Sequence, residues 1–161
     1  LSVGQHGFMG KQNMFEHSMK VPLIAAGPGI PRGKRVDTPV YLQDIMPSSL
    51  ELAGATVPRH VRFKSLLPLL RDGAIAHYDA IYGAYTRFQR MVRVGNMKLI
   101  WYPQPNVFLL FDLAKDPHEL RDLAADPAHA PTLAALKRRL AELQQEMNDP
   151  IRPVITTPTH L

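Results

Sequence analysis

The 161-residue sequence is 45% hydrophobic, contains no cysteine, and carries 19 Lys and Arg against 14 Asp and Glu. This composition predicts one globular domain or slightly more, and it excludes disulfides, thiolate metal ligands and, for want of about 18 consecutive apolar residues, a membrane-spanning helix. Because the net charge of +5 is scattered and forms no basic motif, we expect neither a nucleic acid nor a membrane as partner.

The first half of the sequence predicts the end of an α/β layer. Residues 1–20 form a loop with glycine at positions 4, 7 and 10, and residues 21–26 (Val-Pro-Leu-Ile-Ala-Ala) predict a buried strand, apolar on both faces as in a covered sheet. A basic, proline-bounded loop follows over residues 30–40. A helix is expected over residues 44–53, capped by its first residue, an aspartate, and stopped by Gly54.

The second half predicts an antiparallel sheet closed by a helix. An irregular stretch over residues 55–77 contains a short apolar helix at residues 66–70. Four strand candidates then follow at hairpin spacing, at residues 80–85, 89–94, 97–102 and 107–113. Apolar residues at steps of three and four predict an amphipathic helix over residues 131–147, and the proline-rich residues 150–161 predict a tail.

Candidate functional residues gather in the glycine-rich opening loop. Lys11 suits an anion, because glycines let a ligand approach the backbone and the ammonium supplies a positive charge; on spacing alone, a simply solvated lysine is the favoured alternative. His6, Glu16 and His17 match no metal-ligand spacing, so structural hydrogen bonds are the favoured interpretation of both histidines. The sequence contains no Gly-x-Ser-x-Gly elbow and therefore does not indicate a hydrolase triad.

The opening segment also resembles a known family. Gly4-Gln-His-Gly7, Gly10-Lys11 and Phe15-Glu16, followed by a Val-Pro-Leu-Ile run at residues 21–24, are similar to the C-terminal third of type I sulfatases, in the alkaline-phosphatase-like superfamily. The family pattern is Gly-Glu-His-Gly, a lysine, Tyr-Glu and a Val-Pro-Leu-Ile strand. Gln thus replaces the usual Glu, and Phe replaces the usual Tyr.

Later motifs continue the resemblance in the same order, so that it covers about residues 1–148. They are the helix motif at residues 43–54, the Ser-Leu-Leu-Pro-Leu-Leu run within 64–70, the hairpin of Arg90–Val94 with Lys98, and the Leu-Phe-Asp-Leu signature within 110–124. The resemblance implies that residues 1–75 end a sulfatase α/β catalytic domain. Residues 76–149 would form a small subdomain, a four-stranded antiparallel sheet packed by a C-terminal helix, with residues 150–161 as its tail.

What the resemblance implies about function is a sulfuric ester hydrolase. Such enzymes use a formylglycine nucleophile, made from Cys or Ser in a Cys/Ser-x-Pro-x-Arg motif, and a calcium ion held largely by carboxylates. Lys11 matches the family's active-site lysine, which binds the sulfate and assists catalysis. His6 matches a histidine close to the bound substrate, with a loop-fixing hydrogen bond as the alternative role, and Glu16 is implied to brace the loop.

The sequence departs from the family at the nucleophile and at the calcium ligands. The nucleophile motif is missing, and no calcium ligands are recognised within the chain; we expect them upstream of Leu1. Calcium is therefore expected only in the complete enzyme, with no cofactor for this fragment. We expect the fragment alone to be inactive.

Alternatives stay open at this point. A phosphonate or phosphodiester hydrolase of the same superfamily shares the lysine and the calcium site, and a non-catalytic interaction fragment is a second alternative. The expected substrate is a small-molecule or carbohydrate sulfate ester. Apolar surface favours self-association of the fragment into a homo-oligomer, and the sequence does not distinguish a cytoplasmic from a periplasmic location.

Overall fold

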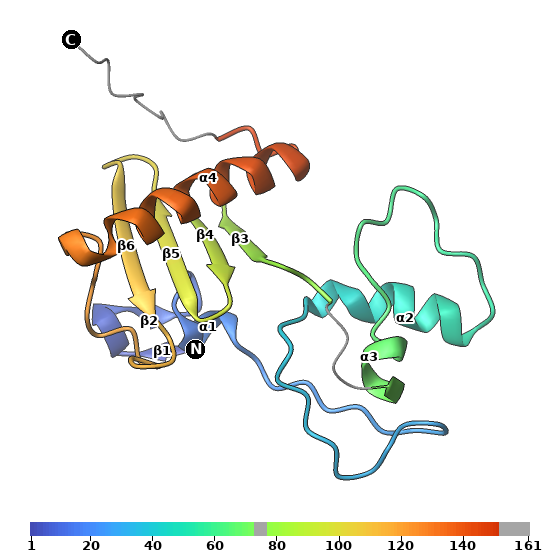
Figure 1. Ribbon diagram of the computed structural model, residues 1–161. Helices are drawn as coiled ribbons and strands as arrows, with labels where there is room; N and C mark the ends of the chain where they lie inside the picture. The colour runs from blue at the N-terminus through green and yellow to red at the C-terminus, as the bar shows by residue number, and fades with distance from the viewer. Residues whose placement is uncertain (73–76, 152–161) are drawn as a thin grey trace. The chain divides into compact units, whose positions relative to one another are not determined.

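A four-stranded antiparallel sheet with strand order β3–β4–β5–β6 organises the later part of the computed structural model (Figure 1). Its strands are β3 (Ile81–Tyr85), β4 (Gln89–Val94), β5 (Met97–Tyr102) and β6 (Val107–Asp112). All four predicted strands are confirmed. Gly95, with φ of 57°, takes the left-handed conformation in the tight turn between β4 and β5, where Val94 pairs with Met97.

One face of this sheet is covered by the helix α4 (Ala130–Glu146), which runs across the strands in Figure 1. Its leucines at positions 136, 140 and 143 are buried, and α4 packs on β4 and β5. Trp101 and Phe108 stack on the same face, and the Lys137 ammonium of α4 lies 3.9 Å from the centre of the Phe108 ring. The helix predicted over residues 131–147 is therefore confirmed within one residue at each end.

The opposite face of the sheet is covered by the first nineteen residues, which the sequence predicted only as a loop. They contain a short hairpin of β1 (Ser2–Val3) and β2 (Met9–Gly10), the 3-10 turn η1 (Gln5–Gly7) and the helix α1 (Glu16–Met19). Phe15 packs on Phe111 of β6, with ring centres 5.9 Å apart. Side chains alternate between the faces of a strand, so Lys98 and Ile100 point toward this segment whereas Leu99 points toward α4.

The structure describes residues 1–72 and 77–151, and within these ranges no helix is long and apolar enough to cross a membrane. The chain divides into two units by packing, a sheet unit of Leu1–Val21 with Tyr82–Leu161 and a helical unit of Pro22–Ile81. The domain boundary that the family resemblance implies, between residues 75 and 76, stays a prediction. Most of the predicted tail, at 150–161, lies outside the described residues.

The helical unit contains the 3-10 turn η2 (Leu42–Asp44) and the helices α2 (Ile45–Leu52) and α3 (Leu67–Asp72), which confirms both predicted helices. The sequence predicted that the side chain of Asp44 caps α2, and this prediction is wrong. The fully buried carboxylate instead accepts hydrogen bonds from the Tyr41 N–H (2.8 Å) and the Tyr78 hydroxyl (2.6 Å). The carboxylate therefore ties the start of η2 to a residue 34 positions further on.

The predicted buried strand at residues 21–26 is wrong in this structure. The segment pairs with no strand among the described residues, and its side chains are exposed, Ile24 to 91%. A strand forms only where a neighbouring strand accepts and donates its backbone hydrogen bonds. The apolar sequence of residues 21–26 favours burial, but no other described segment covers it.

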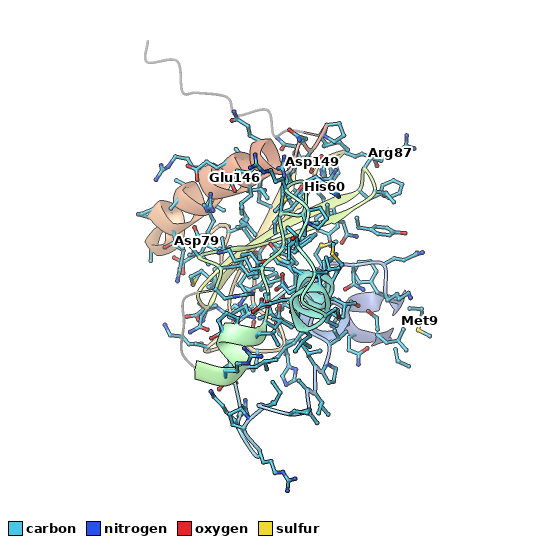
Figure 2. The ribbon with its side chains drawn as sticks, turned by 90° about the vertical axis from the view of Figure 1, so that its right-hand side faces the viewer. Met9, His60, Asp79, Arg87, Glu146 and Asp149 are labelled. Atoms are coloured by element: carbon cyan, nitrogen blue, oxygen red, sulfur yellow. The ribbon has the colours of Figure 1, made fainter. Side chains whose placement is uncertain are left out.

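A buried ion pair joins the end of α4 to the sheet. The Arg90 guanidinium of β4 donates to the Asp149 carboxylate through Nε and through Nη2, the latter at 2.9 Å, and the Tyr82 hydroxyl donates to the same carboxylate. Figure 2 shows Asp149 just beyond the C-terminal end of α4, near Glu146. Burial alone would raise the pKa of Asp149, but the hydrogen bonds from Arg90 and Tyr82 outweigh it and lower the pKa from 3.8 to about 2.

We expect Asp149→Asn to lower the free energy of unfolding by about 2 kcal/mol near neutral pH. The pKa of Asp149 is lower in the folded chain than in the unfolded chain, so its contribution is complete above the unfolded value of 3.8 and is lost as the pH falls toward about 2. Urea unfolding of both proteins at a series of pH values measures the difference. A difference that stayed constant down to the lowest pH would contradict this assignment.

Candidate functional site

The loop that carries the candidate residues is a tight hairpin turn built on glycine. Gly4, Gly7 and Gly10 all have positive φ, of 98°, 73° and 93°, which side chains disfavour. Three backbone hydrogen bonds close the turn, from Gly4 N–H to the Phe8 carbonyl (2.9 Å), from Gly7 to Gly4 (3.1 Å) and from Phe8 to Gln5 (3.0 Å). The regular glycine spacing in the sequence therefore reflects the backbone conformation of this turn.

Lys11 directly follows this hairpin and is exposed. Within the described ranges, no hydrogen bond or ion pair to its ammonium is found. A lysine ammonium carries three donors and a full charge, so Lys11 offers an uncompensated cation at the end of a backbone segment fixed by pairing with β1. This geometry suits an anionic ligand, and the predicted role of Lys11 in binding sulfate stays a prediction.

His6, by contrast, is held by neighbouring groups. Its Nε2 donates a hydrogen bond to the His118 carbonyl at 3.0 Å, which leaves Nδ1 as the remaining polar atom of the ring. The ring stacks on Phe15 at 3.9 Å between centres with an angle of 7°. The loop-fixing role that the sequence left open is thus present, whereas a role in substrate binding stays a prediction. No hydrogen bond joins His6 to Lys11 in the part of the chain that the structure describes.

A second set of polar contacts fixes the base of the loop. Asn13 donates from Nδ2 to the Ser2 hydroxyl at 2.7 Å and accepts at Oδ1 from the Phe15 N–H at 3.1 Å. The Ser2 hydroxyl also contacts Nε2 of His17. Ser2 and Asn13 are 1% and 2% exposed. Sequence reasoning missed both residues, because a serine and an asparagine eleven positions apart carry no local signal.

Buried charges connect the loop to the sheet. The Lys98 ammonium of β5, fully buried, lies 2.9 Å from Glu16 Oε1 and 2.8 Å from Glu119 Oε1. Arg93 lies 3.2 Å from the other oxygen of Glu16, and the Glu16 N–H donates to Glu119 Oε2 at 2.6 Å. The implied bracing role of Glu16 is therefore confirmed, while Lys98 and Glu119 were not recognised as its partners from the sequence.

The residues present do not fit the calcium or the formylglycine of a complete sulfatase. The described residues contain no group of three or more His, Asp or Glu side chains that could hold a metal ion. The whole sequence contains neither a cysteine nor a Ser-x-Pro-x-Arg motif from which a formylglycine could be made. The expectation that these groups come from residues upstream of Leu1 stays a prediction.

A family model supports the interpretation of the loop and the sheet together. Residues 4–146 match the model described as N-sulphoglucosamine sulphohydrolase, C-terminal. The matched range runs from the glycine hairpin to the last turn of α4, so it includes Lys11, His6 and the buried charges. The motifs singled out in the sequence therefore belong to one family pattern.

Curated and solved proteins agree with this match. A Delta 4,5-hexuronate-2-O-sulfatase from Bacteroides thetaiotaomicron is 30% identical, over 87% of this chain and 31% of its own length. A sulfatase-like crystal structure from the same organism has a TM-score of 0.75 at 30% identity, covering 85% of this chain and 32% of the other. A phosphonate monoester hydrolase from Silicibacter pomeroyi has a TM-score of 0.75 at 25% identity, covering 88% and 32%.

The fold is therefore that of the alkaline-phosphatase-like sulfatases, as predicted, with the four-stranded antiparallel sheet and the C-terminal helix in place. The chain spans less than a third of the length of these proteins. It corresponds to the C-terminal part of the relatives.

We expect the stability of the loop to decrease as the pH falls below about 7. Burial, together with the nearby charge of His6, lowers the pKa of His17 from 6.5, so the unfolded chain takes up a proton before the folded chain does. His17→Gln removes this pH dependence. Amide hydrogen exchange of residues 4–16 between about pH 5 and 7.5 measures it. His60→Gln, at an exposed histidine of the helical unit, should leave the pH dependence unchanged. Exchange rates are compared with the intrinsic rates at each pH, and protection factors that stayed equal at all pH values in the wild type would contradict the prediction.

Proposed function

The chain belongs to the sulfatase family, and on that basis we propose that it acts as the C-terminal part of a sulfuric ester hydrolase. The observation that supports this most directly is the exposed Lys11 at the end of the glycine hairpin, inside the family match. The complete activity belongs to a protein about three times longer, as in the relatives.

In this proposal Lys11 binds an oxygen of the substrate's sulfate group. The ammonium is charged and solvent-accessible, and the paired backbone of β1 and β2 fixes where its Cα lies. A charge placed in advance beside a reacting anionic group stabilises negative charge without reorganisation during the reaction. His6, fixed by Phe15 and the His118 carbonyl, would lie close to the substrate with Nδ1 as its remaining polar atom.

Residues outside this chain would have to supply the nucleophile and the calcium ligands. Those residues would supply the nucleophilic chemistry and the neutralisation of the sulfate charge. The residues of this chain would bind and orient the sulfate from one side. The 161-residue chain alone is therefore proposed to be inactive and to bind no cofactor.

A sulfated carbohydrate is the substrate class that we favour. The name of the Bacteroides relative specifies a 2-O-sulfated hexuronate, and the family model is named for a sulfated glucosamine. A sugar sulfate presents hydroxyl groups beside the sulfate, so side chains around the loop could contribute to selectivity. Among the expected small-molecule and carbohydrate sulfate esters, the comparisons favour the carbohydrate.

The similarity to a phosphonate monoester hydrolase supports a second candidate function. Phosphonate and sulfate monoesters are both tetrahedral anions, and an exposed lysine suits either. The curated relative and the family model both carry sulfatase names, which is why we favour the sulfate ester. A non-catalytic interaction fragment is not favoured by any specific contact among the described residues.

We expect the 161-residue chain to bind inorganic sulfate weakly through Lys11. In a sulfate titration followed by NMR, the amide signals of residues 4–12 should shift in the wild type. Lys11→Met should raise the half-saturating sulfate concentration at least about tenfold, because a charge-assisted hydrogen bond is lost. The matched control is Lys20→Met, an exposed lysine nine positions further along, which should leave the titration unchanged. Equal binding by both variants would contradict the assignment of Lys11.

We expect the longer protein that the proposal requires to hydrolyse a 2-O-sulfated unsaturated hexuronate faster than a phosphonate monoester. Its rates on both substrates, at equal concentration and with calcium present, measure the preference. The 161-residue chain serves as the control and should hydrolyse neither. A higher rate on the phosphonate would favour the second candidate function, and calcium-dependent turnover by the short chain would overturn its proposed inactivity.

A further inference from the structure

We propose that Lys98 and Glu119 are positioning residues that hold the Lys11 loop in its binding conformation. Neither residue has a hydrogen bond or ion pair with Lys11 among the described residues; they act on Lys11 through Glu16 and through the backbone at His118. The functional meaning of this inference rests on the proposed function, since Lys11 is the group being positioned. In this proposal, the later strands of the sheet unit and the turn after β6 hold the Lys11 loop in position.

The first argument is the burial of Lys98. Its side chain has no exposed surface, and its ammonium lies between the carboxylates of Glu16 and Glu119, at 2.9 and 2.8 Å. A buried ammonium is costly without partners, and Glu16 supplies one of the two only while the N-terminal segment is docked on the sheet. Undocking the loop would leave Lys98 with one carboxylate. The sheet therefore favours one position of Glu16.

The second argument is the charge balance of this cluster. Arg93, at 3.2 Å from Glu16 Oε2, brings the number of cations to two, against two carboxylates. Every charge is compensated when the segment is docked, and an undocked Glu16 would leave two cations facing one carboxylate. The docked arrangement is therefore the one in which the cations and carboxylates of this cluster balance.

The third argument is the backbone at residues 118–119. Glu119 has φ of 57° and is 2% exposed, and its Oε2 accepts the Glu16 N–H at 2.6 Å. The carbonyl of His118, one residue earlier, accepts Nε2–H of His6. One short turn after β6 thus holds two points of the loop, and Lys11 lies midway between them, five residues after His6 and five before Glu16.

A further contact lies next to Lys11 itself. Nε2 of Gln89, a buried residue at the start of β4, donates to the carbonyl of Gln12 at 3.4 Å. The segment on each side of Lys11 is therefore held, by pairing with β1 before it and by Gln89 after it. The exposed ammonium is attached to a backbone with few alternative positions.

The test compares Lys98→Met with Arg90→Met in the 161-residue chain. Both substitutions remove a buried cation from the same sheet, but Arg90 pairs with Asp149 on the α4 face. Among the described residues, no hydrogen bond or ion pair joins Arg90 to the N-terminal segment. Overall stability is measured by thermal unfolding. The conformation of the loop is measured by amide hydrogen exchange of residues 4–16 and by the ring proton shifts of His6, which report its stacking on Phe15.

If the proposal is right, Lys98→Met speeds exchange of the loop amides at least about tenfold relative to the amides of β4 and β5, and moves the His6 ring shifts toward unstacked values. Arg90→Met lowers the unfolding temperature without either change. Equal responses to the two substitutions, or unchanged His6 shifts in Lys98→Met, would overturn it. Should Lys98→Met fail to fold, Glu119→Gln, which is nearly isosteric and lacks the charge, must show the same selective loosening of the loop.

A sulfate titration separates this inference from the proposed function. If wild-type chain binds no sulfate but Lys98→Met selectively loosens the loop, the proposed role of Lys11 fails and the positioning of the loop stands. If the wild type binds sulfate and Lys98→Met binds it equally well, the positioning inference fails and the role of Lys11 stands. If sulfate binding weakens together with the loss of loop protection, both are supported.

Discussion

The arrangement of the sheet unit depends on a single buried ammonium, that of Lys98, which needs carboxylate partners. Because the side chain of Lys98 has no contact with solvent, carboxylates must approach it from elements outside its own strand. Glu16 and Glu119 do so from positions 82 residues before it and 21 residues after it. The ion pair therefore joins the N-terminal segment, the central strand and the turn after β6 into one unit.

This constraint gives the two faces of the sheet different characters. The face toward α4 is closed by leucines of the helix and by the stacked pair of Trp101 and Phe108. The other face mixes apolar packing, as between Phe15 and Phe111, with the buried charges. Apolar packing alone tolerates small slips of one layer over another, whereas paired charges and directed hydrogen bonds specify position. The face that carries the candidate site is the one with the directed contacts.

Because the chain belongs to the sulfatase family, we relate these directed contacts to the proposed binding of a sulfate group. The match over residues 4–146 spans the hairpin, the sheet and α4 together, and less than a third of the relatives' length is present. In the proposed enzyme, this part contributes a cation for the sulfate while other parts contribute the nucleophile and the metal. Precise placement of such groups matters, because displacement by about 1 Å can reduce a rate a hundredfold. A loop held by buried charges meets that requirement better than a loop held by packing alone.

The sequence by itself determined the four strands of the larger sheet and α4, which lie where they were predicted, since hydrophobic periodicity is a local signal. Its motifs also singled out Lys11 and His6 and indicated the family. Only the tertiary structure decided that Lys98 and Glu119 pair with Glu16, and that residues 21–26 form no strand among the described residues. The physical reason is the same in both cases, because a buried ion pair and a strand each depend on partners far away in the sequence, and no local pattern encodes them.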